Sequence, residues 1–209
     1  MKTLLFYMSV FVLLVMHTAG LYGILYENRE EYVNLTGLNL LISFAILVLN
    51  FETYSLKLFL FLLFIAVLGF AVELAGVHSQ MIFGNYQYSY HLGIRLWGVP
   101  LVIGINWALL IFSIGSALQR FRFSIWMKSF IGAGLMIVLD LLLEPVATTL
   151  GYWQWQADDI PVQNYIAWGL ISFLMFFLCF HFIKKLKNPI GIFIYIIQIV
   201  FFSLLNLLL

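Results

Sequence analysis

Charged residues are scarce in this chain. Only 9% of its 209 residues are Asp, Glu, Lys or Arg, 64% are hydrophobic, and the mean hydropathy is +1.06. An average soluble domain has roughly 25% charged residues. The composition therefore excludes a soluble protein and predicts an all-α, polytopic transmembrane helical bundle. Because the spans need nearly the whole length, we expect a single integral membrane domain over residues 1–209.

Other absences narrow the chemistry. The single cysteine, Cys179, cannot form an internal disulfide and lies in an apolar run typical of a core. A net charge of +1 argues against nucleic acid as a partner. The four histidines lack the spacing of a di-iron histidine box, and the last apolar segment has no Lys for a retinal Schiff base. No Gly-rich phosphate loop and no ligand set for a metal or a nicotinamide is visible, so we expect no metal and no cofactor.

Seven apolar segments are long enough to be considered as membrane spans. The first resembles a signal peptide, but its apolar stretch continues through Leu25, which is too long for a signal-peptide core, and we interpret it as a span. The second segment is the shortest. The predicted spans are 3–25, 36–51, 57–78, 98–119, 125–148, 164–183 and 189–208.

The basic residues predict the orientation of these spans. With seven spans, eight Lys and Arg residues fall on the side of the amino terminus, and only Arg29 and Arg95 fall on the other. Cytoplasmic loops carry an excess of Lys and Arg. We therefore predict a multi-pass protein of the cell (inner) membrane with a cytoplasmic amino terminus and an external carboxyl terminus. The eight residues are Lys2, Lys57, Arg120, Arg122, Lys128, Lys184, Lys185 and Lys187.

Three of the nine acidic residues lie inside predicted spans: Glu73, Asp140 and Glu144. An ionisable group in hydrocarbon is costly and usually functional. At 1.5 Å per residue, Glu73 and Glu144 lie about 24 Å and Asp140 about 18 Å from the cytoplasmic ends of their helices. Asp140 and Glu144 also share one helix face, four residues apart. We predict that the three acids form one catalytic site in the outer half of the bilayer.

Crowded carboxylates in a low dielectric cannot all ionise, so at least one is expected to hold a proton at neutral pH. A neutral carboxylic acid in an apolar pocket can protonate an olefin or an epoxide. Two alternatives remain open. One is that the acids serve only to lock helices together through hydrogen bonds. Asp140 and Glu144 could also hold magnesium for a prenyl diphosphate, although a second acidic motif is absent and only Arg95 is available on that side.

Aromatic and polar residues gather near the outer ends of the same segments. They are typical of an interfacial aromatic belt, and equally of a pocket that stabilises a carbocation through ring quadrupoles. Pro145, next to Glu144, predicts either a simple kink or helix end, or a local opening that admits water near the acids. The predicted substrate-binding residues are Trp107, Asn106, Tyr86, Trp153, Trp155, Asn164, Trp168 and His78.

Several stretches together resemble the membrane carotenoid biosynthesis protein family, over roughly residues 68–170. They are V-E-L-A-G-V-H-S-Q-M-I-F-G-N-Y-Q-Y-S, L-G-I-R-L-W-G-V-P-L, D-L-L-L-E-P-V-A-T-T-L-G-Y-W-Q-W and I-P-V-Q-N-Y-I-A-W. That family includes bisanhydrobacterioruberin hydratases and gamma-carotene 1'-hydratases. The resemblance implies addition of water to the terminal C1–C2 double bond of an acyclic carotenoid end group, without a redox cofactor.

The residues and the resemblance together predict a cofactor-independent carotenoid hydratase, a hydro-lyase whose partners are a carotenoid or another isoprenoid lipid and the membrane lipids. Asp140 is the predicted proton donor, Glu144 the base that positions water, and Glu73 a carboxylate that tunes Asp140 or stabilises the cation. Alternatives are a carbocation cyclase or isomerase of a polyprenyl or carotenoid lipid, and a non-catalytic carotenoid- or lipid-binding membrane protein.

Overall fold

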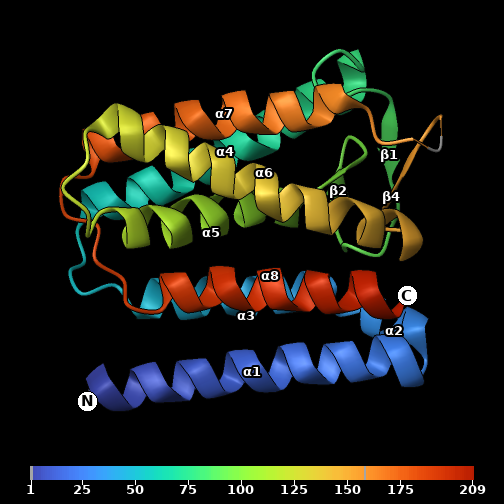
Figure 1. Cartoon of the computed structure of the whole chain (residues 1–209), viewed down its shortest axis with the longest axis horizontal. Helices are drawn as coiled ribbons and strands as arrows, with labels where there is room; N and C mark the ends of the chain where they lie inside the picture. Colours follow the sequence, from blue (N-terminus) through green and yellow to red (C-terminus); the bar gives the residue numbers. More distant parts are fainter. Residues whose placement is uncertain (1, 158) are drawn as a thin grey trace.

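The computed structural model describes residues 2–157 and 159–209 as a bundle of helices with four short strands at one end (Figure 1). The predicted all-α class is confirmed. The helices are α1 (Lys2–Tyr26), α2 (Arg29–Asn34), α3 (Thr36–Leu49), α4 (Leu56–Ser79), α5 (Leu101–Leu118), α6 (Ile125–Thr149), α7 (Val162–Phe182) and α8 (Gly191–Leu208). The strands are β1 (Tyr86–Tyr88), β2 (Arg95–Leu96), β3 (Val99–Pro100) and β4 (Trp153–Trp155).

Seven helical segments in the described residues are long and apolar enough to cross a membrane, as predicted. The second differs from the prediction. The short helix α2 precedes α3, and the two together form a candidate span over Arg29–Leu49. The predicted segment 36–51 contained only the α3 part, because the charged sequence of α2 has no apolar signal. The other predicted boundaries agree with the helices to within three residues.

Helix α5 is at the centre of the packing. It contacts α3, α4, α6, α7 and α8, and 14 of its 18 residues are buried. A helix that is apolar on all sides is typical of such a central position. In Figure 1, α1 lies along one edge of the molecule, with α3 and α8 between it and helices α4 to α7. Helix α1 packs mainly on α2, α3 and α8.

The two helices that carry the acids begin in the same way. Ser55 caps α4 and accepts a hydrogen bond from the amide of Leu58 at 3.1 Å, and Ser124 caps α6 and accepts from the amide of Met127 at 3.2 Å. Such caps satisfy backbone donors that have no partner inside the helix. Glu73 lies about 25 Å along α4 from its first residue at 1.5 Å per residue. The acids therefore lie far from the capped ends.

Pro145 does not end α6. The helix continues through Thr149. The hydroxyls of Thr148 and Thr149 donate to the carbonyl of Pro145 at 3.0 and 2.8 Å. Proline cannot donate its own nitrogen to the carbonyl of Leu141, so one helical hydrogen bond is absent beside Glu144.

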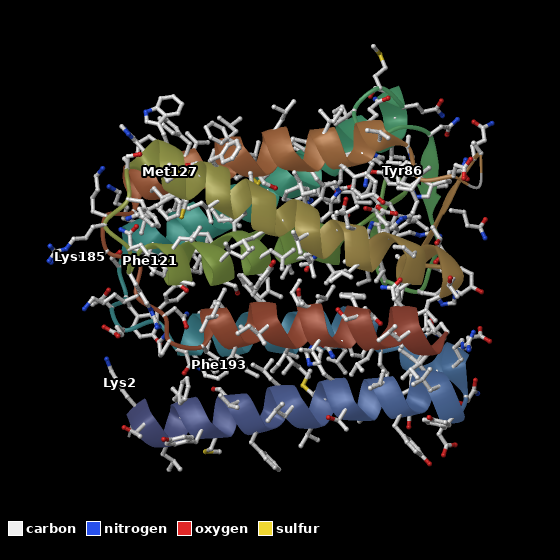
Figure 2. All side chains as sticks on the ribbon, viewed as in Figure 1. Lys2, Tyr86, Phe121, Met127, Lys185 and Phe193 are labelled. Carbon is white, nitrogen blue, oxygen red and sulfur yellow. The ribbon has the colours of Figure 1, made fainter. Side chains whose placement is uncertain are left out.

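The two ends of the bundle differ in chemistry. Figure 2 shows Lys2 and Lys185 at one end, which we call the basic end, and Tyr86 toward the other, which we call the aromatic end. Strands β1 and β4 form an antiparallel ribbon at the aromatic end (Figure 1). The two labelled termini also lie at opposite ends, as an odd number of spans requires.

Candidate active site

Glu73 on α4 is held by three hydrogen-bond donors. Its side chain is buried, with a relative exposure of 3%. The Tyr86 and Tyr88 hydroxyls donate to Oε2 at 2.6 and 2.8 Å, and the Trp107 indole nitrogen donates to Oε1 at 3.0 Å. Gly69, one turn earlier on α4, makes room for Trp107, because a Cβ there would lie 2.5 Å from the Cβ of Trp107. This set of donors suits a carboxylate anion.

Glu144 on α6 is also held by three donors. The indole nitrogens of Trp153 and Trp155 donate to Oε2 at 3.0 and 2.9 Å. The amide nitrogen of Asn164, on α7, donates to Oε1 at 3.2 Å. An indole can only donate, so Oε2 is an acceptor whatever the protonation of the acid. Any proton on Glu144 is therefore on Oε1, the oxygen that faces Asn164.

Asp140 differs from the two glutamates. It is fully buried, and its Oδ2 accepts one hydrogen bond, from the amide nitrogen of Asn164 at 2.8 Å. Its Oδ1 has no hydrogen-bond partner among residues 2–157 and 159–209. Asn164 thus connects Asp140 and Glu144 through one nitrogen. An unpaired buried carboxylate oxygen favours the neutral acid, because a buried charge needs compensating hydrogen bonds.

The β1–β4 ribbon brings the donors together. Its register pairs Tyr86 with Trp155 and Tyr88 with Trp153, and side chains alternate across a strand, so these four residues share the inner face. The ring centroids of Tyr86 and Trp155 are 5.0 Å apart, and those of Tyr88 and Trp153 are 5.7 Å apart. One ribbon therefore supplies donors to acids on two different helices.

The two tyrosines of the ribbon donate as neutral phenols. Burial, followed by the neighbouring Glu73 carboxylate, raises the pKa of Tyr86 above its usual value, and the same two causes raise the pKa of Tyr88. Both hydroxyls therefore keep their protons at neutral pH and remain available to Glu73.

No basic group neutralises the three acids in the part of the chain that the structure describes. The ion pair found there joins Lys187 and Glu52 at 3.6 Å, at the basic end. The described residues also contain no group of three or more His, Cys, Asp and Glu arranged to hold a metal ion. The acids are instead surrounded by hydrogen-bond donors and aromatic rings, and an apolar site that concentrates negative charge in this way suits a positively charged species.

A cavity of about 290 Å³ lies beside the acids. Glu73 and Glu144 line it, but Asp140 does not. Trp107 and Trp168 also line it, and their rings stack with centroids 4.6 Å apart. The volume is at the lower end of the range for drug-sized ligands, so the cavity has room for an end group rather than for a complete long polyene.

The structure brings most of the predicted site residues together. Trp107, Asn106, Tyr86, Trp153, Trp155, Asn164 and Trp168 line the cavity with Glu73 and Glu144. His78 does not line it. The His78 side chain is exposed, and its Nε2 lies 3.1 Å from the carbonyl oxygen of Trp97. Asp140 lies behind the cavity wall and contacts it through Asn164.

Sequence reasoning missed four residues. Tyr88 was omitted although its spacing of two from Tyr86 is the signal for a shared strand face. His17 on α1, Asn39 on α3 and Gln198 on α8 also line the cavity. Their signal was a polar side chain inside an apolar span. That signal does not tell which face of the helix the residue occupies.

The fold and the site define an integral membrane protein with seven candidate spans, in which two of the three buried acids face an aromatic cavity within the bundle. The chain belongs to the carotenoid biosynthesis protein family, whose sequence model matches residues 34–209. The match includes α3 to α8 and every acid of the site. No curated protein and no solved structure matches the chain. The family supports a role in carotenoid biosynthesis and fits a carotenoid or isoprenoid lipid as substrate.

Proposed function

We propose that the protein is a carotenoid 1,2-hydratase, which adds water to the terminal C1–C2 double bond of an acyclic carotenoid end group. The observation that carries the proposal is the position of Glu73 and Glu144. They come from different helices and line one aromatic cavity, with no basic residue paired to either in the described chain. Such a cavity suits a reaction that passes through a cation.

The first step is proton transfer to C2. Asp140 and Glu144 share the amide nitrogen of Asn164, and we assign one exchangeable proton to this pair of carboxyl groups. Glu144 delivers the proton, because it lines the cavity and Asp140 does not. This changes two predicted roles. Glu144, predicted as the base that positions water, becomes the proton donor, and Asp140, predicted as the donor, becomes the proton reserve behind it. The π electrons form the new C2–H bond, and C1 becomes a tertiary cation.

The second step is capture of the cation by water. Glu73, held as an anion by two phenols and an indole, stabilises the charge at C1. The ring faces of Trp107 and Trp168 add to this stabilisation. The water oxygen forms a bond to C1 and releases one proton, which restores the acid pair. The net change is the addition of one water molecule, with no oxidation or reduction.

The length of the substrate fits this arrangement. A carotenoid is about as long as the hydrocarbon layer is thick, roughly 30 Å. An end group in the cavity leaves the polyene in the apolar part of the membrane. The acids lie near the aromatic end, where water is within reach of the site.

Expression in a lycopene-producing bacterium, with mass analysis of the carotenoids, tests the function. A product heavier than the substrate by one water is expected, and its oxygen should come from labelled water. An isomer of unchanged mass would instead support a cyclase or isomerase. Pigment that remains bound but unchanged would support a carotenoid-binding protein.

We also propose that the protein lies in the cell (inner) membrane, with the basic end in the cytoplasm. The support is the excess of Lys and Arg at that end. Reporter fusions at both termini test the orientation. Activity of a cytoplasmic reporter at the amino terminus and of an external reporter at the carboxyl terminus is expected. Both reporters on one side would contradict the seven-span topology.

A further inference from the structure

A second group of polar residues lines the part of the cavity wall that is formed by α1, α3 and α8. His17 on α1, Asn39 on α3 and Gln198 on α8 line the same cavity as Glu73 and Glu144. We call these three residues the polar wall. Each lies in a candidate membrane span. A polar side chain there is costly unless it has a hydrogen-bond partner, and it is usually functional.

The polar wall has unused hydrogen-bonding capacity. The side-chain amide of Gln198 is buried, with a relative exposure of 6%, and it makes no hydrogen bond to any residue in 2–157 or 159–209. Asn39 accepts a hydrogen bond from the Ser43 hydroxyl at 3.2 Å through Oδ1, and its amide nitrogen has no partner in the same ranges. Donors and acceptors on this wall are therefore free for a molecule in the cavity.

The tautomer of His17 follows from its one hydrogen bond. Its Nδ1 lies 2.8 Å from the carbonyl oxygen of Leu13, which can only accept. Nδ1 therefore carries the hydrogen, and Nε2 of the neutral ring is an acceptor with a free lone pair. The ring meets Phe201 edge-on, with centroids 5.5 Å apart. His17 thus offers a base to the cavity, while Glu144 offers an acid.

We propose that the polar wall holds the water that attacks C1, and that His17 Nε2 accepts its proton. A water in an otherwise apolar cavity needs two to four polar partners, about the number that the free groups of His17, Asn39 and Gln198 provide. The water oxygen bonds to C1, one of its hydrogens passes to His17, and the other stays on the product hydroxyl. The imidazolium then returns its proton to the Asp140–Glu144 pair through water. This inference rests on the proposed hydratase function.

The base would come from a helix outside the matched part of the chain. The family match begins at residue 34, so it includes Asn39 and Gln198 but not His17. Helix α1 therefore does more than cover the bundle. It completes the site with a group that the matched residues do not provide.

The test separates formation of the cation from its capture by water. The His17→Gln and Gln198→Leu proteins are supplied with an acyclic carotenoid in D₂O. The cation should still form, so deuterium should enter C2 of the recovered substrate at close to the normal rate. The hydrated product should fall by about 10² or more for His17→Gln, as for loss of a positioned base. For Gln198→Leu it should fall about tenfold, as for loss of one hydrogen bond.

Thr18→Val is the matched control. Thr18 neighbours His17 on α1 but is exposed and does not line the cavity, so both exchange and hydration should be unchanged. Normal hydration by both test variants would overturn the inference. So would an equal loss of exchange and hydration, which would indicate a structural role. Both of these results leave the hydratase function standing. Exchange without any hydrated product from the unaltered protein would overturn the function and the inference together.

Discussion

Glu52 and Glu144 are residues of the same type in two different environments, at opposite ends of the bundle. Glu52, at the basic end, is 48% exposed and pairs with Lys187, which is 69% exposed. Glu144, at the aromatic end, is 2% exposed and has no basic partner in the described chain. Water stabilises the first charge, whereas hydrogen bonds from two tryptophans and Asn164 must stabilise the second. A charge that the protein itself must solvate is one whose protonation the protein can control.

The same contrast extends to the surroundings of the two residues. The basic end holds most of the positive charge of the chain, on side chains that reach solvent, and the orientation proposed for the protein rests on this charge. The aromatic end holds three buried acids and their donors. The comparison predicts that identical substitutions will have very different consequences at the two ends.

The largest effect is expected for Glu144→Gln. Glutamine keeps the shape of the side chain but cannot deliver a proton, so hydration should fall by about 10²–10⁴. Deuterium exchange into the substrate should fall equally, because the cation no longer forms. Asp140→Asn removes the reserve proton, so the product should also fall strongly while the protein still folds and retains pigment. Mass analysis of the carotenoids measures both effects.

Glu52→Gln provides the matched control for this comparison, since it makes the same chemical change at the basic end. Its hydration rate should be normal. Near-normal hydration by Glu144→Gln would remove that residue from the role of donor and would leave Glu73 as the acid that lines the cavity.

Glu73→Gln should have the next largest effect. The substitution removes the negative charge beside C1, and loss of one such electrostatic group typically costs about 10²–10³ in rate. Glutamine would also place an NH2 group where one carboxylate oxygen was, facing either the Tyr86 and Tyr88 hydroxyls or the Trp107 indole. The turnover rate at saturating substrate, measured beside the affinity for the carotenoid, separates the two effects. A lower affinity with an unchanged turnover rate would contradict a role in stabilising the cation.

A smaller effect is expected for Tyr88→Phe. It removes one of the three donors to Glu73, and a hydrogen bond to a charged group contributes about 1.5–3 kcal/mol. The midpoint of thermal unfolding in detergent should fall accordingly. Tyr90→Phe, two residues later and exposed, should leave the midpoint nearly unchanged. Equal midpoints for the two variants would show that the Tyr88 hydroxyl does not support Glu73.

The smallest effect is expected for the stability of Glu52→Gln. An exposed ion pair contributes less than about 1 kcal/mol, and salt screens it. The shift in the unfolding midpoint should be small and should vanish at high ionic strength. A large shift that persists in salt would mean that the two ends do not differ in the way the structure indicates.

Much of the site could be predicted because its signals are local. An acid in an apolar run is visible without any knowledge of the fold, and this was enough to find Glu73, Asp140 and Glu144. The tryptophans after α6 were found from another local signal, the crowding of aromatic residues after Glu144. His78 satisfied the same local criterion, yet the structure turns it to the surface and brings Tyr88 to Glu73 instead. The number of residues between a side chain and Glu73 does not determine whether that side chain faces the cavity.

By itself, the sequence determined the number of spans and the positions of the acids along them. This follows from the physics of the membrane, because each span must satisfy its own backbone hydrogen bonds and must be apolar over a fixed length. Only the tertiary structure decided which groups meet. Helices that are apolar on nearly all sides carry little information about their rotation. The packing of α3 and α8 on α5, and of α1 on α3 and α8, sets which faces of these helices line the cavity. The pairing of β1 with β4 joins residues far apart in the chain and decides which donor serves which acid.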